Sequence, residues 1–411
     1  MIEFERHILK NGLKLIIHKD DSTPMACVNI LYNVGARDED ERKTGFAHLF
    51  EHLMFGGSIN IPNYDEPLQL VGGENNAFTT NDITNYYCTV PAENLETAFW
   101  LESDRMLSLA FTDKSLEVQR NVVIEEFKQR YLNQPYGDVW LLLRPLAYKV
   151  HPYKWATIGK EIAHIENAVM SDVKSFFKKH YCPANAILVV AGRVDSRQVL
   201  ELAQKWFEPI EGGHATIHNL PAEPEQKEER KQTVHRDVPQ DAIYKTYHMC
   251  ARTDPDYYAT DIVSDILSRG NSSRLHISLV KEKKLFSEIS AYVMGDMDKG
   301  LFVISGKLSE GVSVEQAEEG IDAELQKIKT ELVPEEELQK CKNKVESTLI
   351  FSEMDVLNKA TNLAVAELLG DANEVNTEVE KYQRVTSADV KRVAGSVLRK
   401  ENCSTLYYLK K

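Results

Sequence analysis

Two histidines and a glutamate in the segment Gly45–Met54 could carry metal-dependent chemistry. His48 and His52 are at positions i and i+4, so both imidazoles would leave the same face of a helix about one turn apart. That spacing allows both rings to bind a single zinc ion. Glu51 directly precedes His52 and would lie close enough to accept a proton from a water molecule at the ion without being a ligand. The order H-x-x-E-H therefore predicts a hydrolytic zinc site.

Chance produces this motif only rarely in a chain of this composition. With 12 histidines and 63 acidic residues in 411 positions, independent placement gives about 0.05 occurrences. The alternative interpretation is a surface helix that carries two histidines and a solvated glutamate. Apolar neighbours argue against it, because they predict a buried helix whose histidines and glutamate need partners. These neighbours are Phe46, Leu49, Phe50, Leu53 and Phe55.

Length and composition indicate an ordinary soluble protein of two domains. A chain of 411 residues exceeds one ordinary core, so two domains of about 200 residues are expected. The net charge of −14 argues against a nucleic-acid partner. No apolar run approaches the roughly 20 residues of a membrane span, so no membrane partner is expected. The charged N-terminus lacks a secretory signal, and the six scattered cysteines are typical of a reducing compartment, so we expect a cytoplasmic protein.

The elements around the motif can be predicted from their residue patterns. Residues 13–18 and 27–34 are rich in strand-forming residues, and the motif helix is expected to begin near Thr44, a suitable N-cap. Two antiparallel strands are expected at 75–80 and 84–90. The other expected elements of the first half are helices at 64–71, 94–109, 115–132 and 171–180, and a buried strand at 186–191.

The second half of the chain repeats the first in outline. The pattern Leu116-x4-Asn121-x-Val123 recurs from Leu338, and the segment 171–174 resembles 387–391. Several such matches share one order and a nearly constant offset, which predicts duplicated α+β domains. Each domain is expected to pack helices on one face of a largely antiparallel sheet.

The predicted domain boundaries follow from composition. Residues 211–231 combine proline, glycine and a charge cluster, which is typical of a solvated linker between domains. This places a zinc-binding catalytic domain at 1–210. It also places a homologous domain without a metal site at 232–411.

A third zinc ligand is required, since a catalytic zinc ion usually has three protein ligands and one open position. An acidic residue is the leading type, and Arg120–Phe127 holds both Glu125 and Glu126. Together with the H-x-x-E-H order, this segment resembles the inverzincin peptidases, the family of pitrilysin, insulin-degrading enzyme and mitochondrial processing peptidase. The resemblance implies a glutamate ligand at a characteristic distance along the chain after the second histidine. Glu126 fits this position, and Glu125 ranks second.

The resemblance covers most of the chain and implies how substrate and partners bind. Tyr181–Asn185 before an apolar strand, and 385–390, are similar to further landmarks of the family. In the family an edge strand aligns the substrate backbone, and the residues similar to it are Asn75, Asn76, Ala77, Phe78 and Thr79. A chain of this length with two similar halves resembles the processing-peptidase branch, in which two chains pair to enclose a chamber.

Two departures from the family pattern affect these expectations. Gln119 stands where members often carry a glutamate, so it is expected to hydrogen-bond behind the ligands without adding charge. Val280 and Ser287 align with an arginine–tyrosine pair that the family uses to grip substrate, unless the alignment is shifted by a residue or two toward Lys281. The missing grip implies a heterodimer with a related non-catalytic subunit. The alternative is a homodimer in which other residues, such as Arg274 or Lys281, supply the grip.

The sequence as a whole therefore predicts a zinc-dependent endopeptidase. His48, His52 and Glu126 would hold one zinc ion per chain, and Glu51 would be the general base. The expected substrates are extended peptides or unfolded segments, cleaved inside a chamber formed by paired chains. One alternative is a non-catalytic assembly subunit of a peptidase-like complex, which the intact motif argues against. A zinc hydrolase acting on other substrates is a further alternative, which the substrate strand disfavours.

Overall fold

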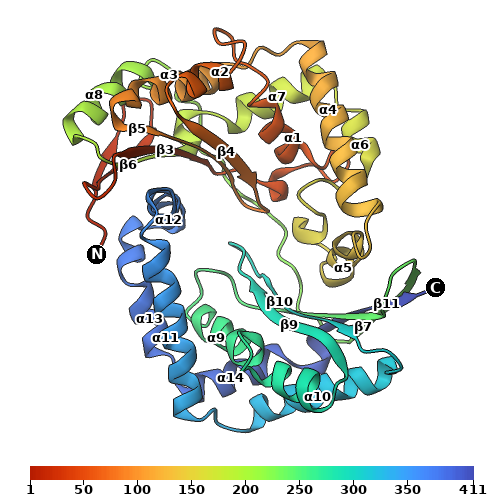
Figure 1. Cartoon of the computed structure of the whole chain (residues 1–411). Coiled ribbons are helices and arrows are strands. Elements are labelled where there is room, and N and C mark those ends of the chain that lie inside the picture. The colour runs from red at the N-terminus through yellow and green to blue at the C-terminus, as the bar shows by residue number, and fades with distance from the viewer. The chain divides into compact units, whose positions relative to one another are not determined.

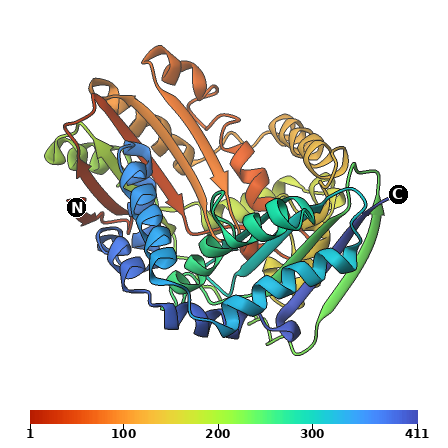
Figure 2. The same ribbon diagram turned by 60° about the horizontal axis from the view of Figure 1, so that its bottom comes forward.

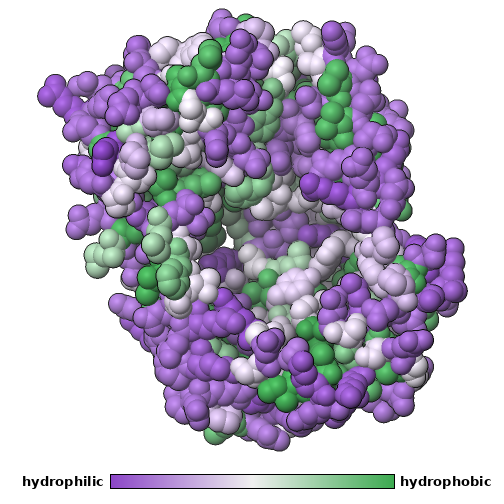
Figure 3. All heavy atoms as spheres, viewed as in Figure 1, coloured by the Kyte–Doolittle hydropathy of each residue, from purple (hydrophilic) through white to green (hydrophobic).

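The computed structural model describes residues 1–411 and contains two β-sheets, each with its own helices. The chain divides into two compact units (Figure 1). Unit 1 comprises Met1–Lys128, Trp155–Leu220 and Ile350–Thr377, and unit 2 comprises Gln129–Lys154, Pro221–Leu349 and Glu378–Lys411. None of the helices is both long and apolar enough to cross a bilayer. Hydrophilic residues dominate the visible surface of both units, with apolar residues dispersed among them (Figure 3).

Unit 1 is built on a mostly antiparallel sheet with the strand order β1-β2-β6-β3-β5-β4. Only the β2–β6 pair is parallel. Every residue of β6 is buried, as expected for a strand that is covered on both faces of the sheet. The strands are β1 Glu5–Ile8, β2 Lys14–Lys19, β3 Met25–Tyr32, β4 Glu74–Thr79, β5 Thr84–Pro91 and β6 Ala186–Gly192.

Helices cover both faces of this sheet. The helices α3 and α8 lie on one face, and α12, from the second half of the sequence, packs on β3 and β6 from the other (Figure 1). The Asp20 carboxylate accepts a hydrogen bond from the Lys359 ammonium and so links α12 to the end of β2. The helices are α1 Phe46–Leu53, α2 Asp65–Leu70, α3 Leu95–Leu107, α4 Asp113–Phe127, α6 Ile162–Glu166, α7 Met170–His180, α8 Ser196–Trp206 and α12 Val356–Leu369.

Unit 2 repeats this strand order without a counterpart of β1. Its sheet has the order β7-β11-β8-β10-β9, and only the β7–β11 pair, the counterpart of β2–β6, is parallel. The C-terminal strand β11 (blue) lies beside β7 (green) in Figure 2. The strands are β7 Arg230–Arg236, β8 Ala242–His248, β9 Phe286–Met294, β10 Leu301–Leu308 and β11 Cys403–Lys410.

The helices of unit 2 follow the same plan. A large apolar core joins α9, α10, α11 and α14 to the sheet, while α5, from the first half of the sequence, packs on β7, β8 and β11. Lys245 of β8 is buried and binds Glu318 and Asp322 of α10, which ties that helix to the sheet. The helices are α5 Val139–Ala147, α9 Tyr257–Ser268, α10 Val314–Thr330, α11 Glu335–Ser352, α13 Glu378–Arg384 and α14 Ser387–Val397.

The predicted α+β fold is confirmed, and the two sheets show the predicted duplication. Helices were predicted on one face of each sheet, and in unit 1 α12 covers the other face as well. The structural units, however, differ from the continuous ranges 1–210 and 232–411. Helix α12, from the second half of the sequence, belongs to unit 1 because its apolar face packs on the sheet of that unit, here called sheet 1. Helix α5, from the first half, belongs to unit 2 because it packs on the sheet of unit 2, here called sheet 2. Residues 211–229, most of the predicted linker, contain no helix or strand.

Candidate metal centre

Helix α1 carries the H-x-x-E-H residues and has an unusual N-terminus. Gly45 precedes the helix with a φ of 85°, and a Cβ there would lie 2.6 Å from the carbonyl oxygen of Ile158. Only glycine suits both this conformation and this close approach. Thr44 was predicted as the N-cap, but its side chain instead contacts His164 and accepts a hydrogen bond from the amide of Lys160.

The carboxylate of Glu39 caps α1 in place of Thr44. Its two oxygens accept hydrogen bonds of 2.8 Å from the backbone amides of Gly45 and Ala47, which are among the unpaired donors at a helix start. Burial raises the pKa of Glu39 to about 8, while the two amide donors oppose that rise. Sequence reasoning missed this residue because a cap so far upstream of the helix leaves no local motif.

Helix α4 brings an acidic side chain to the histidines of α1. Its N-terminus is capped by Thr112, whose hydroxyl oxygen accepts a hydrogen bond from the Ser115 amide, and the helix packs against α1 (Figure 1). Glu126 Oε2 lies 3.1 Å from Nε2 of His52 and 3.6 Å from Nε2 of His48. The potential ligand atoms of all three residues lie within 4.8 Å of one another.

This donor set fits a zinc ion. Two imidazole nitrogens and one carboxylate oxygen are a known ligand set of catalytic zinc. Ligands at the usual bond lengths of about 2.1 Å in a tetrahedron are about 3.4 Å apart, and the two distances to Glu126, 3.1 and 3.6 Å, bracket this value. The three side chains are largely buried, at 11%, 26% and 16% exposure for His48, His52 and Glu126, which leaves limited access from solvent.

The neighbouring glutamate of α4 points elsewhere. Glu125 forms an ion pair of 2.7 Å with Lys128, and 62% of its side chain is exposed. Of the two glutamates that the sequence offered, only Glu126 lies with the histidines. Gln119, predicted behind the ligands, makes no hydrogen bond to any of the three, and its amide nitrogen lies near Gly56.

Glu51 is held by the strand that was predicted to bind substrate. The hydroxyl of Thr79, at the end of β4, donates a hydrogen bond of 2.6 Å to Oε2 of Glu51. The sequence placed Thr79 on this strand but gave no indication that it contacts Glu51. Strand β4 pairs with β5 alone and forms the edge of sheet 1, so its other side has no partner strand. The predicted substrate-binding residues Asn75, Asn76, Ala77, Phe78 and Thr79 all lie on this edge.

The loop that follows α1 is fixed by polar side chains of α3. Asp104 accepts hydrogen bonds from Ser58 and from the backbone and side chain of Asn60. The neighbouring Arg105 is fully buried, pairs with Glu102, and lies over the rings of Phe55, Tyr64 and Tyr86. Such a buried and hydrogen-bonded charge pair keeps one arrangement of its surroundings, which steadies the C-terminal end of α1.

The second half offers no substrate grip at the positions that the sequence singled out. Val280 lies in a π-helical turn and Ser287 on β9, and neither carries a cation or a phenol. The guanidinium of Arg274 forms two hydrogen bonds, of 3.0 and 2.7 Å, with Glu337. Lys281 is exposed.

Family models of known proteins match both halves of the chain. A family model described as Insulinase (Peptidase family M16) matches residues 14–150, which include every residue of the candidate metal centre. A second, described as Peptidase M16 inactive domain, matches residues 168–345.

Individual relatives match over nearly the whole chain. The chain is 32% identical to the zinc protease PqqE of Helicobacter pylori, over 98% of this chain and 91% of that protein. A crystal structure of a protease from Helicobacter pylori superposes with a TM-score of 0.93 at 30% identity, and covers 99% of this chain and 100% of that one. A protein named probable mitochondrial-processing peptidase subunit beta, from Arabidopsis thaliana, is 24% identical over 95% of this chain and 75% of its own length.

Proposed function

Because the chain belongs to the M16 family of zinc proteases, we propose that it is a zinc-dependent endopeptidase. His48, His52 and Glu126 are the proposed ligands of one zinc ion per chain, and Glu51 is the proposed general base. The observation that carries the proposal is the convergence of two imidazoles and one carboxylate from α1 and α4, within 4.8 Å, beside the edge strand β4. Such convergence is what a catalytic zinc site requires.

A zinc ion at this position would act as a Lewis acid on the scissile carbonyl and on the attacking water. The remaining steps belong to side chains of this protein. Glu51 accepts the proton of the attacking water and later delivers it to the leaving amine. The Thr79 hydroxyl donates to Oε2 of Glu51, so it orients the base and links it to the strand that is proposed to hold the substrate.

Substrate binding would use the free edge of β4. An extended peptide can add to this edge as a further strand, with hydrogen bonds between main chains. This pairing reads no sequence, so cleavage preference comes from side-chain pockets, with Phe78 as the leading candidate for lining one. Extended peptides and unfolded segments are therefore the proposed substrates.

Pairing with a second chain completes the proposal. Val280 and Ser287 offer neither a cation nor a phenol to a peptide carbonyl, and Arg274 is engaged by Glu337. A related non-catalytic subunit that supplies the grip would explain this, with a chamber between the chains, and the Arabidopsis relative is itself named as a subunit. The homodimer is the alternative. The cytoplasmic location stays a prediction.

The decisive experiment measures zinc content, oligomeric state and peptide cleavage on the purified chain. We expect one zinc ion per chain and cleavage of an unstructured quenched-fluorescence peptide that a chelator abolishes and added zinc restores. Weak cleavage by the chain alone, and strong cleavage after a partner is added, would support the heterodimer. Full activity as a homodimer that survives combined Arg274→Ala and Lys281→Ala changes would refute it. Bound zinc without cleavage under either condition would favour the non-catalytic assembly subunit.

A further inference from the structure

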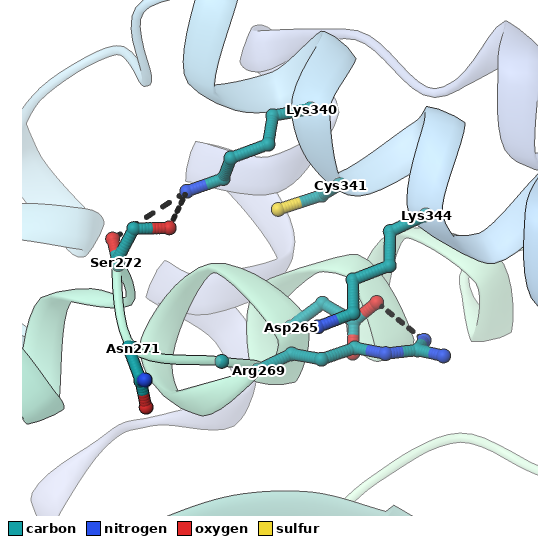
Figure 4. Close-up of a pocket in the computed structure, with 8 residues that line it drawn as sticks. Asp265, Arg269, Asn271, Ser272, Lys340, Cys341 and Lys344 are labelled. Carbon is teal, nitrogen blue, oxygen red and sulfur yellow. Dashed lines mark hydrogen bonds and ion pairs between the residues drawn. The ribbon is translucent and has the colours of Figure 1, made fainter.

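A cavity in unit 2 lies between the C-terminal end of α9 and the middle of α11, whereas the candidate metal centre belongs to unit 1. Its volume is about 270 Å³. Figure 4 shows residues that line it. Helix α9 contributes Asp265, and the turn that follows it contributes residues 269–272. Helix α11 contributes Lys340, Cys341 and Lys344. All of these residues belong to unit 2.

Positive charge dominates the lining. Arg269, Lys340 and Lys344 carry three positive charges, and Asp265 carries the only carboxylate. Burial raises the pKa of the Cys341 thiol to about 11, so this side chain adds no negative charge near neutral pH. The cavity therefore has a net charge of about +2, in a chain whose net charge is −14.

Two of the three cations lack an ion-pair partner. Asp265 binds Arg269 at 2.9 Å. Lys340 contacts only Ser272, through its carbonyl oxygen at 3.4 Å and its hydroxyl at 3.1 Å, although Glu336 lies one turn before it on α11. The ammonium of Lys344 makes no hydrogen bond or close ion pair, although its charge opposes the rise in the pKa of Asp265. It lies against Gly270, 3.0 Å from where a Cβ would be. Two lysines at i and i+4 repel each other, so their convergence on one cavity has a cost that an anion would remove.

We propose that this cavity binds a phosphate group, either free or as the ester of a small molecule. The charge of the cavity supports this class of ligand. A phosphate monoester carries about −1.5 to −2 at neutral pH and would balance the net charge of about +2, whereas a single carboxylate would balance only half of that charge. Lysine ammonium groups are strong donors to phosphate oxygens, and Ser272 offers a hydroxyl at the same rim. The volume lies just below the roughly 300–1,000 Å³ of pockets for drug-sized ligands, so a small ligand fits.

The test uses inorganic phosphate and AMP, titrated into the full-length protein by calorimetry at constant ionic strength, with chloride as the balancing anion. We expect saturable binding of at least one of them. In the variant Lys340→Gln/Lys344→Gln the affinity should fall by about tenfold or more, since two charge-assisted hydrogen bonds are lost. The single variant Lys344→Gln should show part of the loss without disturbing the fold, because the exposed ammonium of Lys344 makes no hydrogen bond. Equal affinity for both ligands would identify free phosphate as sufficient, and tighter AMP binding would identify an ester.

A matched control removes two charges elsewhere. Lys178 of α7 and Lys227 are exposed and make no hydrogen bond, so Lys178→Gln/Lys227→Gln should bind like the unmodified chain. Phosphate can also bind a zinc ion, and binding of that origin would persist when Lys340 and Lys344 are changed. Unchanged affinity in that double variant, or no saturable binding to the unmodified chain, would overturn the proposal. Neither outcome depends on peptidase activity.

Discussion

The helix pair α1/α4 of unit 1 and the pair α9/α11 of unit 2 occupy the same places in the two repeats. Asp265 and Arg269 are the counterparts of His48 and His52. The sequence offset between these two pairs equals the offset between the equivalent strands β5 and β10. Thr348 follows Glu126 at the offset of the repeated Leu-x4-Asn-x-Val pattern. In unit 1 the two histidines and Glu126 converge in a group that could hold a metal ion. In unit 2 the guanidinium of Arg269 is the cation, and it binds both Asp265 and Thr348.

The link between helix and edge strand is also shared. Glu51 accepts a hydrogen bond from Thr79 of β4. Its counterpart, Ser268, donates to the carbonyl of Ala291 on β9 and accepts from the amide of the same residue. One position therefore carries a proposed proton-transfer group in unit 1 and a purely structural hydroxyl in unit 2. The comparison teaches that the same scaffold positions four side chains in each unit. In unit 2 they form an internal ion pair, and in unit 1 they form the proposed metal site.

The most disruptive test replaces a histidine of α1 by the residue type that its counterpart has in α9. His52→Arg should abolish zinc binding, to below about 0.1 ion per chain, because a guanidinium beside Glu126 replaces the metal. Peptide cleavage should fall to background while the chain stays folded. The measurement is zinc by mass spectrometry together with circular dichroism. Arg269→His, the reverse change, should leave the zinc content at one per chain, and a second zinc ion there would contradict the comparison.

Changing the base should be nearly as damaging for catalysis but harmless for the metal. Glu51→Gln removes the proton acceptor and should lower kcat by about 10²–10⁴-fold with zinc retained. Ser268→Ala, at the equivalent position of unit 2, should leave kcat unchanged. Zinc content and kcat measured on the same preparations separate the two roles. Near-normal turnover of zinc-loaded Glu51→Gln enzyme would show that Glu51 is not the base.

The choice between adjacent glutamates gives a graded effect. Glu126→Gln should weaken zinc binding by about 100-fold, whereas Glu125→Gln should change it little, since neighbouring helical side chains point about 100° apart. Competition with a chromogenic chelator measures both affinities. If Glu125→Gln proved the more damaging change, the third ligand would have to be reassigned.

The smallest expected effect concerns the ion pair of unit 2. Burial raises the pKa of Asp265 to about 6, above the value of about 3.9 expected for an unfolded chain. The native state therefore binds more protons than the unfolded state between these values, so this residue lowers the free energy of unfolding as pH rises from 4 to 6. From pH 4 to pH 7, the free energy of unfolding of Asp265→Asn should rise by about 2 kcal/mol relative to that of the unmodified chain. Urea unfolding at both pH values measures the gain, and parallel pH profiles would contradict it.

Local sequence patterns predicted the features that depend on residues close together in the sequence. The repeat, the alternation of strands and helices, and the spacing of His48 and His52 follow from periodicity. The proximity of Glu126 to both histidines was expected from the family resemblance, and the structure shows it, although the ligand roles stay predictions. The prediction that Thr44 caps α1 was wrong. Thr44 fits the local preference for an N-cap, but Glu39 provides the cap, and no sequence pattern indicates the turn that brings it there. The cavity between α9 and α11 was equally hidden, since it forms from two helices that are distant in the sequence.

The reciprocal placement of α5 and α12 has a consequence for biosynthesis. The inner strands β3 and β6 owe their burial in part to α12, which a ribosome completes only after it has synthesised the long stretch Pro221–Leu349 of unit 2. At roughly 5–20 residues per second, the nascent sheet would wait on the order of 10–30 s with one apolar face uncovered. During that interval it would be a client for a chaperone that binds nascent chains. A ribosome-stalled chain ending at Leu220 should thus recruit more of such a chaperone than a full-length released chain, and equal recruitment would show that the face is covered by another route.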